Sequence, residues 1–69
     1  MNYEDQKRIA LQKLCEAVQV TVPSVMKMTL VDEGSTVLIT YMTGYQREVN
    51  VNGDSCNAMM ADVLNEFLK

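Results

Sequence analysis

Residues 25–51 read VMKMTLVDEGSTVLITYMTGYQREVNV, and this stretch decides the fold. It is rich in Val, Ile, Thr, Tyr and Met, several of which favour an extended backbone. Gly34 and Gly44 divide it into three pieces, and glycines at such positions indicate tight turns. The stretch therefore predicts three antiparallel strands joined by two hairpins.

The turn lengths follow from the need to place apolar side chains on one face, because a slip of one residue moves every side chain to the other face. A two-residue turn at Glu33 and Gly34 sets Leu30 opposite Val37. In the second hairpin a two-residue turn would set apolar residues against polar ones, so we predict a three-residue loop that ends at Gly44. The expected core-facing residues are Met26, Met28, Leu30, Val37, Ile39, Tyr41, Tyr45, Val49 and Val51, with Arg47 as the one charged member.

Amphipathic helices are predicted on both sides of these strands. From about Tyr3 to Gln19 the apolar residues recur at spacings of three and four, and Asn2 is a candidate N-cap. The single proline should end this helix, because it restricts the residue before it. A second stripe of the same period runs from Cys56 to Leu68, with Asp54 or Ser55 as its cap.

A three-stranded sheet needs one face covered, and two apolar helix stripes are present to cover it. We therefore predict a single α+β domain over residues 1–69, with the order α-β-β-β-α: a three-stranded antiparallel meander with both helices packed on one face. The opposite side, which we call the open face, is expected to display Val25, Lys27, Thr29, Val31, Thr36, Leu38, Thr40, Met42, Gln46, Glu48 and Asn50.

Composition limits the kinds of function. Nine acidic and six basic residues give a net charge of −3, and the bases are scattered, so no broad basic face for nucleic-acid phosphates is expected. No apolar run approaches the roughly 20 residues that span a bilayer. The first residues are acidic where a secretory signal would be basic. We expect a cytoplasmic protein that binds neither nucleic acid directly nor membranes.

The residues that catalysis and metal binding use are scarce. The chain has no His, and Cys15 and Cys56 are far apart, whereas a zinc site needs about four ligands. Both cysteines fall on apolar helix faces, so we expect reduced core residues. No carboxylate pair or Gly-rich phosphate loop is recognisable. We expect no enzyme activity, no catalytic residue, no metal and no cofactor.

Arg47 is the residue that does not fit its surroundings. On the core-facing side of the third strand it must reach solvent past a helix edge, pair with an acid or meet a ligand. Because Arg binds carboxylate or phosphate through its planar fork, Arg47 and the neighbouring Tyr45 form a candidate anion site. The open face is the candidate protein-binding surface, with Thr29, Val31, Leu38, Thr40, Met42 and Glu48 as its expected members.

Residues 39–51, ITYMTGYQREVNV, followed by Gly53-Asp54-Ser55 and Ala58-Met59, resemble a pattern in small uncharacterised accessory proteins of bacteriophages and integrative elements. In those proteins a Gly-Tyr hairpin, a Val-Asn-Val strand and an Asp-Ser helix start recur. The resemblance covers roughly the last 30 residues and implies a mobile-element origin. Small acidic proteins of that origin, including anti-CRISPR families of similar layout, commonly block a host defence complex by occupying its surface.

Three hypotheses for function follow. The first is a non-catalytic phage or mobile-element protein that binds and inhibits a host defence protein through the open face or its acidic helix surfaces. The second is an oligomer that sequesters a nucleotide-like anion near Arg47 and Tyr45. The third is a structural homodimer that pairs its open faces and binds no ligand.

Overall fold

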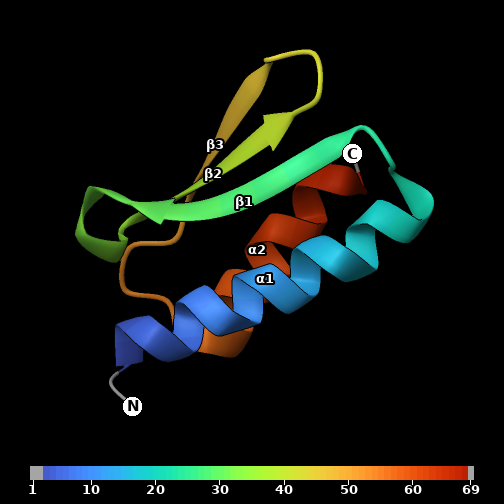
Figure 1. Ribbon diagram of the computed structural model, residues 1–69. Helices are drawn as coiled ribbons and strands as arrows, with labels where there is room; N and C mark the ends of the chain where they lie inside the picture. Colours follow the sequence, from blue (N-terminus) through green and yellow to red (C-terminus); the bar gives the residue numbers. More distant parts are fainter. Residues whose placement is uncertain (1–2, 69) are drawn as a thin grey trace.

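The computed structural model describes residues 3–68 and has the predicted α-β-β-β-α order (Figure 1). Its elements are α1 (Tyr3–Thr21), β1 (Val25–Val31), a short 3-10 turn (Asp32–Gly34), β2 (Thr36–Tyr41), β3 (Gln46–Asn50) and α2 (Cys56–Phe67). The strands form one antiparallel sheet in the order β1-β2-β3. The predicted N-cap Asn2 lies outside the described residues.

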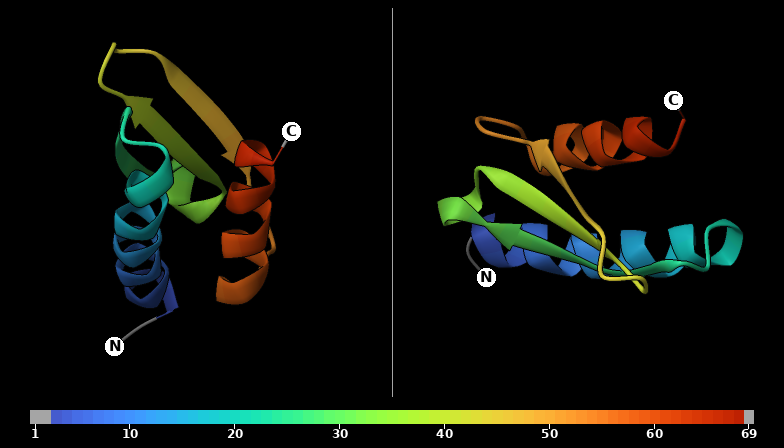
Figure 2. Two further views of the ribbon diagram at one scale, coloured as in Figure 1. Left: turned by 90° about the vertical axis from the view of Figure 1, so that its right-hand side faces the viewer. Right: turned by 90° about the horizontal axis from the view of Figure 1, so that it is seen from above.

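Both helices cover the same face of the sheet. Figure 1 shows α1 and α2 below the strands, and Figure 2 shows that the two helices run in the same direction. Their first turns meet, because the Tyr3 hydroxyl donates to the Asp54 carbonyl at 3.4 Å and the Cys56 thiol lies 4.0 Å from the Gln6 carbonyl. The core between helices and sheet consists of Leu11, Cys15, Val18, Val25, Met28, Leu30, Val37, Ile39, Val49, Val51, Met59 and Val63. One sheet face is shielded and the other is uncovered.

The first helix extends past its predicted end at Gln19. The Val22 N–H still donates to the Val18 carbonyl at 2.8 Å, so helical hydrogen bonding continues almost to Pro23. Cys15 is buried as predicted, whereas Cys56 is half-buried, and both thiols are free. Within residues 3–68, neither helix combines the length and the apolar character that crossing a lipid bilayer requires.

The first hairpin has the predicted register and turn. The Ser35 N–H donates to the Asp32 carbonyl at 3.1 Å, around Glu33 and Gly34. Both of these central residues have positive φ, 56° and 89°, as a primed type I turn requires. Asp32 is left-handed as well, with a φ of 52°. Because a left-handed backbone costs an ordinary side chain about 1–2 kcal/mol, Glu33 is strained, whereas Asp adopts this region more readily.

The second hairpin has the predicted three-residue loop. Gly44 has a φ of 91°, and its N–H donates to the Tyr41 carbonyl at 2.9 Å. Ile39 pairs with Arg47, as predicted. The tip of this hairpin projects beyond the helices (Figure 1), and Tyr45 is 63% exposed there. The prediction that Tyr45 belongs to the core is therefore wrong, because no helix lies beneath the tip.

The start of β1 differs from the prediction. Val25 pairs with Tyr41, and a β-bulge shifts the register before Lys27. Val25 is consequently 0% exposed in the core, whereas Met26 is 47% exposed. The amide of Gln19 holds the bulge, since its Nε2 donates to the Val25 and Met26 carbonyls at 2.9 and 3.3 Å. The assignments of Val25 to the open face and of Met26 to the core are wrong.

Candidate functional site

The open face predicted from the sequence is the uncovered side of the sheet. Thr29, Val31 and Leu38 are half-buried on it. Glu48 is exposed on β3, and Met42 is 69% exposed in the second hairpin loop. These predicted residues lie together on one accessible and partly apolar surface.

The open face also carries a polar contact and two opposite charges. Thr40 is only 5% exposed, and Gln46 Nε2 donates to its hydroxyl at 3.5 Å. Thr40 therefore supports the sheet and offers a partner little area. Lys27 on β1 and Glu48 on β3 are both exposed and carry opposite charges. Since these charges balance, the open face has no net electrostatic preference.

Arg47 pairs with an acid, which is one of the three outcomes that its position allowed. Its Nη2 lies 2.9 Å from Oε1 of Glu66 on α2, and the two side chains are 31% and 19% exposed. The pKa of Arg47 is raised, chiefly because the guanidinium donates a hydrogen bond to Tyr41 and further by the charge of Glu66. The rings of Tyr41 and Tyr45 are 5.6 Å apart between centroids and tilted. This cluster ties β3 to α2.

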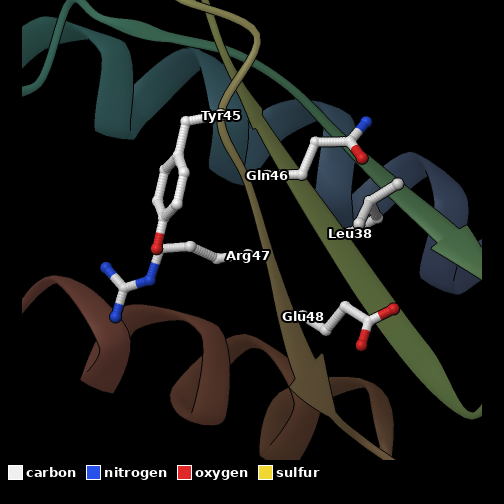
Figure 3. A pocket seen from close by; sticks show the side chains of 5 residues that line it. All are labelled: Leu38, Tyr45, Gln46, Arg47 and Glu48. Atoms are coloured by element: carbon white, nitrogen blue, oxygen red, sulfur yellow. The ribbon is translucent and has the colours of Figure 1, made fainter.

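The ion pair bears on the predicted anion site at Arg47 and Tyr45. A guanidinium that already binds a carboxylate has fewer donors left for a phosphate. Figure 3 shows these two side chains on one side of β3, with Gln46 and Glu48 on the other side near Leu38. Together they line an open groove of about 550 Å³ around the edge of the strand. Anion binding at Arg47 stays a prediction.

A second groove adjoins the first between β3 and α2. It has a volume of about 400 Å³ and is lined by Glu48, Val49 and Asn50 of β3 and by Asp62, Asn65 and Glu66 of α2. Glu48 lines both grooves. We call the two together the edge groove, because they follow the outer edge of β3.

The outer edge of β3 exposes main-chain hydrogen-bonding groups. The Tyr41 N–H donates to the Tyr45 carbonyl at 2.9 Å, so Tyr45 directs its main chain towards β2. In an antiparallel ladder the direction alternates, and therefore Gln46, Glu48 and Asn50 direct their N–H and C=O groups outward. The side chains of Gln46, Arg47 and Asn50 hydrogen-bond the Thr40 hydroxyl, the Glu66 carboxylate and the Asn52 N–H, and not these outward main-chain groups. The edge can accept a further strand.

The outer edge of β1, by contrast, is covered by side chains of α1. Arg8 Nη1 donates to the Leu30 carbonyl at 3.4 Å. Gln19 occupies the Val25 and Met26 carbonyls, as described above. The bulge also breaks the regular spacing of this edge, which hinders pairing with another strand. The two edges of the sheet therefore differ in their capacity to bind.

A further cluster, where the start of α1 approaches α2 and the loop before it, was not predicted from the sequence. Lys7 is 7% exposed, and its Nζ lies 4.9 Å from the centre of the Tyr3 ring. The pKa of Asp54 is raised, chiefly by a hydrogen bond with Asp62 and then by burial, while Lys7 lowers it. Asp54 Oδ2 is buried and has no hydrogen-bond partner within residues 3–68. Burial without a donor agrees with the raised pKa of Asp54, because a protonated Asp54 carboxyl group can itself donate a hydrogen bond to Asp62. The burial of Lys7 could have been predicted from the sequence, because Lys7 lies four residues before Leu11 and therefore on the same, core-facing side of the helix.

Within residues 3–68, no group of three or more His, Cys, Asp or Glu side chains is arranged to hold a metal ion. In comparisons with protein-family models, curated proteins and solved structures, nothing matches this chain. Its function must therefore be inferred from the surfaces themselves.

Proposed function

We propose that this chain is a non-catalytic binding protein that docks another protein through the open face of its sheet. The observation that supports this most strongly is the placement of α1 and α2 on one side, which leaves the other side uncovered (Figure 1). Val31, Leu38 and Met42 keep apolar area accessible on that side. Contact with a partner would remove this area from water, which favours association.

The partner that fits this surface is a protein with a flat, largely uncharged patch. Binding to a nucleic acid or an anionic membrane requires clustered Lys and Arg side chains, whereas on this face Lys27 is balanced by Glu48. The resemblance to mobile-element accessory proteins would make the partner a bacterial host protein and place both in the bacterial cytoplasm. Docking would then inhibit the partner by covering its surface.

The test is capture of a partner that depends on the open face. Wild-type protein, Leu38→Lys and Val20→Lys are immobilised and exposed to bacterial lysate, and bound proteins are quantified by mass spectrometry. Val20 is 81% exposed on α1, so its variant adds the same charge away from the open face. A protein retained by wild type and by Val20→Lys but lost with Leu38→Lys supports the proposal. If no captured protein distinguishes the variants, docking through the open face is wrong.

Two controls make this outcome interpretable. Met42→Lys changes a highly exposed loop position on the same face, so it reports on docking even if Leu38→Lys is poorly folded. Light scattering over a range of concentrations gives the mass of each variant. A wild-type dimer that Leu38→Lys or Met42→Lys abolishes would show that the open face pairs with a second copy, which contradicts docking on a different protein.

A further inference from the structure

We propose that the free edge of β3 binds an extended, basic segment of a partner protein as a fourth strand of the sheet. This goes beyond docking on the open face, because the contacts are main-chain hydrogen bonds at the sheet edge. Such strand addition is a recurring mode of peptide recognition, in which the backbone supplies affinity and alternate side chains supply specificity.

The hydrogen-bonding groups at this edge match an extended peptide. Gln46, Glu48 and Asn50 direct their N–H and C=O groups outward at every second residue, which places them about 6.8 Å apart. A segment of about five residues can therefore satisfy all of them. The other outer strand, β1, is less available, because Arg8 and Gln19 occupy the carbonyls of Leu30, Val25 and Met26 and the bulge interrupts its spacing.

The edge groove supplies room on both sides of such a segment. Its two parts, of about 550 and 400 Å³, meet at Glu48. Because side chains of a strand alternate between faces, one set would lie beside Gln46 and Glu48 on the open face. The other set would lie over α2, where Asp62 and Glu66 line the groove.

The charge of the edge groove selects a basic segment. Among the described residues that line it, Glu66 is already paired with Arg47, and Asp62 is hydrogen-bonded to Asp54, so Glu48 is the carboxylate most available to a bound segment. Complementary charge favours the encounter with Lys and Arg side chains and disfavours acidic segments. Glu48 is the middle one of the three outward residues, so a basic residue directly opposite it forms a cross-strand charge pair.

The same geometry disfavours a second copy of this chain as the occupant. Antiparallel pairing of two β3 strands about Glu48 would set that carboxylate opposite its counterpart in the other copy. Like charges directly opposite each other destabilise a strand pair. A charged residue on an outer strand is also a common protection against edge-to-edge aggregation. The occupant is therefore a different segment of opposite charge.

The test uses the full chain and a short synthetic peptide of alternating Lys and Thr. One control is the acidic analogue of alternating Glu and Thr, and the other is the basic peptide N-methylated on the nitrogens that would face β3. Amide hydrogen exchange, followed by NMR, reports on the outward N–H groups of Gln46, Glu48 and Asn50. At a peptide concentration ten times the Kd, exchange at these amides should slow by about tenfold.

Protection of these three amides by the basic peptide, and by neither control peptide, supports strand addition. Equal protection by the N-methylated peptide, chemical-shift changes without protection, or no binding would overturn it. Concentration-dependent protection without any peptide would show that a second copy occupies the edge, which also overturns it. Because this assay is read at β3 and the lysate capture at Leu38, either proposal can fail without the other.

Variants at the edge separate the contribution of charge from the contribution of main-chain hydrogen bonds. Glu48→Lys should weaken binding of the basic peptide by roughly fivefold. Glu16→Lys makes the same charge change on the exposed surface of α1 and should leave the Kd unchanged. Glu48→Pro removes an outward N–H at an outer strand, where proline is tolerated, and should abolish protection at the neighbouring amides. Wild-type binding by both Glu48 variants would refute the proposal.

Discussion

Leu38 and Ile39 are neighbours on β2 whose side chains point to opposite faces of the sheet, and replacing each with Thr tests which face is covered. Ile39 is 0% exposed beneath the helices, whereas Leu38 is half-buried on the open face. Thr is β-branched and suits a strand at either position, so the two variants differ chiefly in burial.

The expected loss of folding free energy in each variant follows from the burial of the replaced side chain. At Ile39, losing a buried methylene costs about 0.5–1.5 kcal/mol, and a buried hydroxyl without a partner adds about 1–3 kcal/mol. The resulting loss of about 1.5–4.5 kcal/mol is a large part of the roughly 3–10 kcal/mol expected for a chain of this length. At Leu38 the hydroxyl stays in contact with water, and the loss should remain below about 1 kcal/mol.

Thermal melts and urea titrations of both variants provide the measurement. Since 1 kcal/mol shifts the Tm of so small a domain by about 4–8 °C, Ile39→Thr should lower the Tm by roughly 6–36 °C and Leu38→Thr by less than about 8 °C. If Ile39→Thr does not fold, Ile39→Val should still cost about 0.5–1.5 kcal/mol. Equal losses at the two positions, or a larger loss at Leu38, would refute the assignment of the open face.

Three further outcomes are expected. Glu33→Asn should raise the free energy of unfolding by about 0.5–1 kcal/mol, because Asn tolerates the left-handed backbone of the first turn better than Glu. A urea titration measures this, and a lower midpoint would contradict the turn geometry. Asp54→Asn should raise the Tm more at pH 7 than near pH 4, as measured by melts at both pH values. The raised pKa of Asp54 means that the folded state favours its protonated form, so this contribution to stability is present at low pH and lost as the pH rises through the folded pKa. A gain independent of pH would argue against the contact with Asp62. In a double-mutant cycle, Arg47→Met and Glu66→Gln together should lower the Tm by less than the sum of the single losses, whereas additive losses would mean that the ion pair does not stabilise the packing of β3 on α2.

The strand order and both turns could be predicted because few registers place the apolar residues of this stretch on one face. The left-handed glycine of the second loop, Gly44, lies where that requirement puts it. The start of the second helix could also be predicted, because a helix cap depends on residues that are close in the sequence. Ser55, one of the two predicted caps, accepts a hydrogen bond from the Ala58 N–H at 3.1 Å.

The errors came from features that a local sequence pattern does not contain: contacts between different elements, and the lengths of the elements relative to one another. Val25 and Met26 are both apolar, and either could face the core. The choice is made by Gln19, whose amide stabilises the bulge from α1. Tyr45 fits the apolar pattern of its strand, but the hairpin extends beyond the helices. Helix and hairpin lengths relative to one another are not visible in a strand pattern.

The candidate surfaces were predictable to different degrees. The open face follows from the alternation of side chains along strands, which identified Thr29 and Leu38. The edge groove was not predicted, because any three-stranded meander has two outer strands. The positions of Arg8 and Gln19 show that the β1 edge is partly covered, and the pairing of β3 with β2 shows which groups of β3 point outward.

The placement of both helices on one side of the sheet can be measured by NMR. Val37, Ile39, Met59 and Val63 are all 0% exposed in one core. Methyl groups of the two β2 residues should therefore show nuclear Overhauser effects to methyl groups of α2, and the Leu38 methyls should show none to either helix. Overhauser effects from Leu38 to α1 or α2 would contradict an uncovered face and remove the surface on which docking is proposed.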